Sequence, residues 1–115
     1  ISAEMLNAAQ EEWFPNAVHL AGYGNSLFGV CMEFGGPPDR QLQYFPYKPR
    51  HLVQVNDDGR VCMSRLDETV LIANLHERDA ATAIPAPTEI AQDFGPGVAD
   101  PHPFSPAIES NVGIY

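Results

Sequence analysis

The chain has 115 residues, 44% of them hydrophobic and 18% charged, which are the proportions of a folded globular protein rather than a disordered one. This length predicts a single domain, because it leaves no room for a second hydrophobic core. The net charge of −9 disfavours nonspecific binding to nucleic acid or to an anionic membrane surface.

No apolar run of the sequence reaches the roughly 18 to 20 residues that a helix needs to span a bilayer. The N-terminus also lacks the basic and then apolar order of a signal peptide. The sequence therefore predicts a soluble protein with no visible targeting segment, and it leaves the cellular compartment unknown.

Residues 2–13 predict an amphipathic helix. Ser2 is a good N-cap, and Glu4 in the first turn suits the helix dipole. Apolar side chains follow at helical spacing on one face: Met5, Leu6, Ala9 and Trp13. We expect this face to pack against a sheet, with Trp13 largely buried.

Three short strands are predicted before residue 50. Residues 17–22 and 26–34 have strand-like sequence, and Gly-Tyr-Gly-Asn at 22–25 between them is typical of a hairpin turn. Residues 41–45 predict a further strand, and the prolines at 46 and 49 place it at an edge of the sheet.

The clearest hairpin signal lies in the middle of the chain. Residues 51–55 and 60–66 predict two strands, and Asn-Asp-Asp-Gly at 56–59 predicts the tight turn between them.

The segment from Asp67 to Ala81 fits two structures. Asp67 as N-cap and apolar residues at helical spacing favour a helix. The run of apolar and β-branched residues at 69–72 favours a strand instead. We predict the helix.

Six prolines follow residue 84, and they exclude any long regular element from this part of the chain. We therefore predict an α+β fold, in which residues 1–84 form a single domain with an antiparallel sheet of about four to five strands. Residues 85–115 are predicted to form an extended proline-rich C-terminal arm with one short turn. Isolated apolar residues are expected to anchor it to the domain or to a second copy, as a homo-oligomer: Phe94, Phe104, Ile114 and Tyr115.

Cysteines and histidines give no sign of a metal site, because no two of them have the short spacing typical of ligands. We predict no metal and no cofactor.

Cys31 and Cys62 each lie in an apolar run, which favours buried free thiols over a disulfide. A Cys31 nucleophile with His51 or His76 as its base is an alternative, since catalytic partners need only meet in space.

The middle of the chain is basic and both flanks are acidic. Residues 40–66, the basic island, carry a net charge of +3, whereas residues 1–39 carry −5 and residues 67–115 carry −7. Aromatic side chains beside cations anchor protein interfaces, and they also stack on single-stranded nucleic acid. The acidic flanks favour a protein partner over nucleic acid. Aromatic residues that merely cap the core are an equally good interpretation. The predicted partner-binding residues are Arg40, Tyr44, Tyr47, Lys48, Arg50, Arg60, Arg65 and Phe104.

No catalytic constellation is evident, so we hypothesise a protein-interaction module of accessory, inhibitor, immunity or assembly type rather than an enzyme. Two alternatives stay open. One is a structural subunit of a larger assembly such as a virus particle. The other is a small hydrolase or metalloenzyme that uses Cys31 or dispersed histidines.

Overall fold

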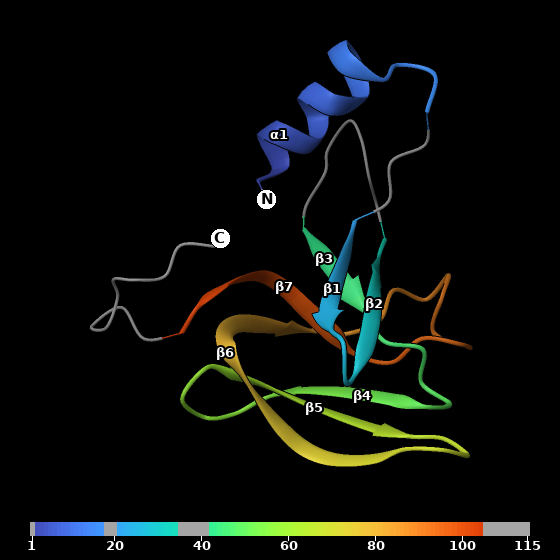
Figure 1. Cartoon of the computed structure of the whole chain (residues 1–115), viewed down its shortest axis with the longest axis vertical. Coiled ribbons are helices and arrows are strands. Elements are labelled where there is room, and N and C mark those ends of the chain that lie inside the picture. The colour runs from blue at the N-terminus through green and yellow to red at the C-terminus, as the bar shows by residue number, and fades with distance from the viewer. Residues whose placement is uncertain (1, 18–20, 35–41, 105–115) are drawn as a thin grey trace.

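The structure, a computed structural model, describes residues 2–17, 21–34 and 42–104. Over these ranges the chain forms one short N-terminal helix and a seven-stranded antiparallel sheet in the order β1-β2-β3-β7-β6-β5-β4 (Figure 1). The predicted α+β class and the antiparallel sheet are confirmed. The sheet is larger than the predicted four to five strands, because two segments that we expected to be a helix and an arm are strands.

The N-terminal helix begins where the sequence predicts. Helix α1 spans Ala3–Ala8, and the Ser2 side chain accepts a hydrogen bond from the Met5 backbone N–H. A π-helical turn, Ala9–Trp13, continues it. The helix stands apart from the sheet, and Trp13 is 58% exposed (Figure 1). The prediction of a buried Trp13 against the sheet is therefore wrong. An apolar face shows that a helix can pack against another surface, but it does not specify which surface.

The first hairpin is present, but its turn lies further along the chain than predicted. Strand β1 spans Gly22–Asn25 and β2 spans Gly29–Glu33, so the predicted turn residues 22–25 are a strand. The Asn25 carboxamide oxygen accepts the backbone N–H groups of Leu27 and Phe28, and this side chain shapes the turn at 26–28. Ala17 lies in a turn, and the rest of the predicted strand before residue 21 lies outside the described residues.

Strand β3 spans Gln43–Phe45, and it is a central strand rather than the predicted edge strand. It pairs with β2 on one side and with β7 on the other. The proline at 46 follows the last residue of β3 and lies outside its paired residues. Its missing N–H therefore does not prevent β3 from pairing with a strand on each side.

The second hairpin is confirmed. Strand β4 spans His51–Val55, β5 spans Arg60–Leu66, and residues 56–59 form the turn. Gly59 has a φ of +89°, which glycine adopts without strain, and its N–H donates to the Asn56 carbonyl.

The predicted helix at 67–81 is wrong, because strand β6 spans Leu71–Ile84. The Asp67 side chain does accept backbone N–H groups, from Thr69 and Val70, as an N-cap would. Here these bonds form a turn that leads into a strand, and N-caps and such turns use the same residue types. Pairing with β5 and β7 on its two sides then fixes the extended conformation.

Part of the predicted arm also belongs to the sheet. Strand β7 spans Gly97–Pro103 and lies between β3 and β6, so the expectation of no regular structure after residue 84 beyond one turn is wrong. Its prolines at 101 and 103 lie beyond the two residues that pair with β3, where a missing N–H removes no bond to that strand. Residues 105–115, with Ile114 and Tyr115, lie outside the described residues, and the boundary at residue 84 stays a prediction.

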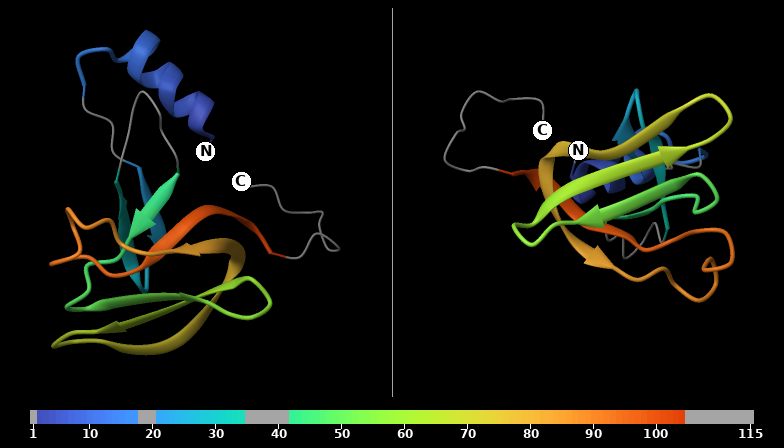
Figure 2. Two further views of the ribbon diagram at one scale, coloured as in Figure 1. Left: turned by 180° about the vertical axis from the view of Figure 1, so that it is seen from behind. Right: turned by 90° about the horizontal axis from the view of Figure 1, so that it is seen from below.

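The core lies inside the curved sheet. Strands β4, β5 and β6 lie side by side on one wall, and β7 crosses behind them (Figure 2). The β1–β2 turn contributes Phe28, which is fully buried. Strands β2, β3, β4, β5 and β7 supply the rest of the cluster: Cys31, Tyr44, Val53, Val61, Met63 and Val98.

Candidate functional site

A tight turn between β3 and β4 presents three of the predicted partner-binding residues together. We call Tyr47, Lys48 and Arg50 the basic corner. The backbone N–H groups of Arg50 and His51 both donate to the Tyr47 carbonyl, at 3.1 and 3.0 Å. These two bonds close the turn, so the three side chains project from a backbone of fixed conformation.

A distant segment of the chain holds the basic corner in place. The Lys48 N–H donates to the Asp93 carbonyl at 3.0 Å, and the Gly95 N–H donates to the Pro46 carbonyl at 3.0 Å. The Tyr47 and Phe94 rings meet edge to face, with centroids 6.1 Å apart. The corner is therefore braced by residues 93–95 as well as by its own turn.

The two cations of the basic corner stay available at the surface. The Arg50 guanidinium lies 5.4 Å from the centre of the Tyr47 ring, and Tyr47 is 39% exposed. The Lys48 Nζ donates to the Ala91 carbonyl at 2.7 Å. Within the described part of the chain neither Lys48 nor Arg50 forms an ion pair, although the protein carries a net charge of −9.

Arg65 differs from these two cations, because it forms an ion pair within the same chain. Its guanidinium lies 2.8 Å from an Asp67 carboxylate oxygen and donates to the Leu27 carbonyl. The hydrogen bonds from Thr69 and Arg65 hold the pKa of Asp67 well below its ordinary value. Arg65 therefore joins the β1–β2 turn to β5, which is a structural role.

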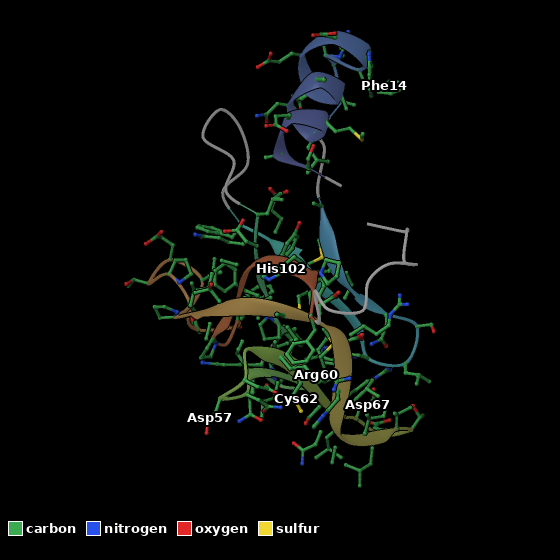
Figure 3. The ribbon with its side chains drawn as sticks, turned by 90° about the vertical axis from the view of Figure 1, so that its left-hand side faces the viewer. Phe14, Asp57, Arg60, Cys62, Asp67 and His102 are labelled. Carbon is green, nitrogen blue, oxygen red and sulfur yellow. The ribbon has the colours of Figure 1, made fainter. Side chains whose placement is uncertain are left out.

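Arg60 lies at the other end of β5, about 16 Å from Arg65 along the strand. Its Nε donates to the Glu77 carbonyl at 2.6 Å, and its guanidinium lies over the Phe104 ring at 5.4 Å. Figure 3 labels Arg60 and also Asp67, the ion-pair partner of Arg65. The predicted basic island is thus divided, and its two ends face different surroundings.

Three predicted partner-binding residues remain. Tyr44 is 4% exposed and belongs to the core, and we leave it out of any surface. Arg40 lies outside the described residues. Phe104 is half-buried against Arg60, and its N–H donates to the Arg78 carbonyl.

Neither cysteine has the surroundings of a nucleophile. Both are free and buried, and burial raises the pKa of Cys31 to about 12. The Cys62 sulfur lies 3.8 Å from the Asn74 side-chain oxygen. Among the residues that the structure covers, no hydrogen bond joins a cysteine to a histidine, and no group of three potential metal ligands is present. The prediction of buried free thiols is confirmed.

His51 is the one histidine with an unusual environment in the described ranges. Both its ring nitrogens are buried with no hydrogen-bond partner among the described residues, and its ring lies 4.6 Å from the Phe28 ring, centre to centre. Burial lowers the pKa of His51, and the Phe28 backbone nearby opposes this shift. The nearby charges of Arg65 and Arg50 lower the pKa further. At neutral pH this residue serves as a neutral part of the core wall.

We expect Cys31 to be unreactive in the folded protein. At pH 8 its high pKa leaves about one thiol in ten thousand as thiolate, so alkylation by iodoacetamide should be about 1000-fold slower than for the unfolded chain. Mass spectrometry of samples alkylated with and without urea measures the ratio at this residue. Rapid alkylation of Cys31 in the folded protein would restore the alternative of a cysteine nucleophile.

Sequence reasoning missed a polar contact between the first hairpin and β6. The Tyr23 hydroxyl donates to the Asp79 carboxylate at 2.8 Å, and the Asn25 amide donates to the Glu77 carboxylate. Asp79 is 5% exposed, and its other oxygen has no hydrogen-bond partner in the part of the chain that the structure describes. No local signal could have revealed these pairs, because they depend on β6 being a strand that passes beside β1.

In the part of the chain that the structure covers, no helix has both the length and the apolar character needed to cross a membrane. Comparisons with protein-family models, with curated proteins and with solved structures find no match to this chain.

Proposed function

We propose that this protein is an interaction module that binds an acidic segment of a partner protein at the basic corner. The observation that carries the proposal is the pair of surface cations, Lys48 and Arg50, which form no ion pair with any residue that the structure describes, in a chain of net charge −9. Internal neutralisation would have made them structural, as it does for Arg65. Accessory, inhibitor, immunity and assembly proteins all work by such binding.

The chemistry of the corner favours carboxylates. A guanidinium binds a carboxylate through two parallel hydrogen bonds, and an ammonium adds a point charge beside it. Tyr47 supplies an aromatic surface of the kind that anchors protein interfaces. Because the Phe94 contact and the bonds to residues 93–95 already order the backbone, binding costs less conformational entropy there.

The net charge argues against nucleic acid as the partner. Two cations on an acidic protein cannot supply the continuous positive groove that follows a phosphate backbone. The enzyme alternative finds no support in the described residues either, since the Cys31 thiol is protonated at neutral pH.

The test compares two variants of equal net charge in affinity capture from the native source. Lys48→Gln with Arg50→Gln removes the two cations, and the control, Gln54→Glu with Thr82→Glu, adds two charges at exposed positions elsewhere. We expect the first variant to lose about 10- to 100-fold in affinity, because two charge-assisted contacts disappear. The control should bind as the native chain does, and native binding should weaken as salt is raised above about 0.15 M. Equal capture by both variants at every salt concentration would remove the basic corner from the function.

A further inference from the structure

We infer that the acidic partner of the basic corner is the end of the N-terminal helix of a second copy of this chain. The inference rests on the proposed function and names its partner. Two exposed surfaces of the chain support this inference, because each presents the chemical groups that the other can bind.

The first surface is the end of the helix. Glu11 and Glu12 are exposed neighbours there, and Trp13 follows them at 58% exposure. The Trp13 indole makes no ring contact or hydrogen bond with the described chain. Large aromatic side chains that stay this exposed beside charges mark contact sites for other proteins.

The second surface is the basic corner, and the match is in both charge and ring chemistry. Two carboxylates at successive positions of the helix match in charge two cations of one turn, Lys48 and Arg50, that have no ion pair in the described chain. The indole of tryptophan is the aromatic face that attracts guanidinium and ammonium groups most strongly. Tyr47 adds a ring against which the Trp13 side chain can pack.

A single copy does not make this contact itself. The helix lies at one end of the molecule and the β3–β4 turn lies toward the other end (Figure 1). The view of the side chains places Phe14, which follows Trp13, far from the sheet (Figure 3). Two copies related by a twofold axis would make the contact twice, and this closes the assembly as a dimer.

Net charge sets the condition under which the dimer forms. Two chains of −9 repel each other at low ionic strength, whereas at about 0.15 M salt this repulsion is screened beyond roughly 8 Å. The local ion pairs act over shorter distances and survive that screening better. Association should therefore be strongest at intermediate salt.

The test is sedimentation velocity of the full chain with two charge-reversed variants. One carries Lys48→Glu and Arg50→Glu, and the other carries Glu11→Lys and Glu12→Lys. The native chain should dimerise between about 10 µM and 1 mM, and each variant alone should stay monomeric. An equimolar mixture of the two variants should dimerise again, because each contact then joins opposite charges.

Circular dichroism establishes that both variants fold before they are compared. A native chain that is monomeric at about 1 mM, or a mixture of folded variants that stays monomeric, would overturn the inference. The proposed function is judged separately by the glutamine variants, which would still lose a different acidic partner.

A Trp13→Ala chain should lose at least 10-fold in self-association if the indole packs on the cations. Unchanged dimerisation by that chain would refute the placement of Trp13.

Discussion

Replacing Gly97 by alanine is expected to destabilise the fold by about 3 kcal/mol or more. A Cβ atom at this position would lie 1.9 Å from the Tyr44 carbonyl oxygen and 2.8 Å from a Phe45 ring carbon. Gly97 begins β7, and the next residue, Val98, pairs with Tyr44 of β3, so relieving the clash requires these two central strands to separate. Urea unfolding followed by circular dichroism measures the loss.

Gly95→Ala is the matched control, two residues earlier in the chain. Its Cβ would lie 3.4 Å from the Lys48 Cβ, which is an ordinary contact, and we expect a change of less than about 1 kcal/mol. If both alanines destabilise the protein equally, the close approach of β3 and β7 is not what requires glycine at position 97.

Phe28→Ala should cost about 3 to 5 kcal/mol, because the ring is fully buried in the turn that closes the core. Trp13→Ala, by contrast, should cost less than about 1 kcal/mol, since the indole is 58% exposed. The comparison is informative because the amphipathic pattern predicts a similar cost, about 3 to 5 kcal/mol, for the Trp13 substitution.

Urea unfolding of the monomer, at low protein concentration and followed by far-ultraviolet circular dichroism, tests both substitutions without relying on the fluorescence of Trp13. A loss of 3 kcal/mol or more from Trp13→Ala would place the helix face in the core, on the scale of other large-to-small changes. That result would also contradict the role of Trp13 in self-association, which requires an exposed indole.

The basic corner could be found from the sequence because its residues are neighbours in the chain. Pro46 precedes Tyr47, Lys48 and Arg50, Pro49 lies among them, and strand β4 follows them. Any fold therefore keeps the three residues together. The brace from residues 93–95 could not be found this way, because contacts across so many residues leave no local pattern. The division of the basic island had the same cause: the two ends of a strand are close in sequence but about 16 Å apart.

Local physics accounts for what the sequence by itself determined. The Ser2 N-cap, the β4–β5 hairpin with its Asn-Asp-Asp-Gly turn, and the buried free thiols depend on neighbouring residues or on hydropathy alone. The antiparallel sheet follows from that hairpin.

Only the tertiary structure decided the conformations of residues 71–84 and 97–103, and the position of the helix. Asp67 begins a helix or a turn equally well, and pairing with β5 and β7 selected the strand. The prolines of β7 are tolerated because that part of the strand lies beyond β3. The helix shows the same limit: Leu6 on its apolar face is buried but Trp13 is exposed, because burial requires a matching surface that hydrophobic periodicity does not specify.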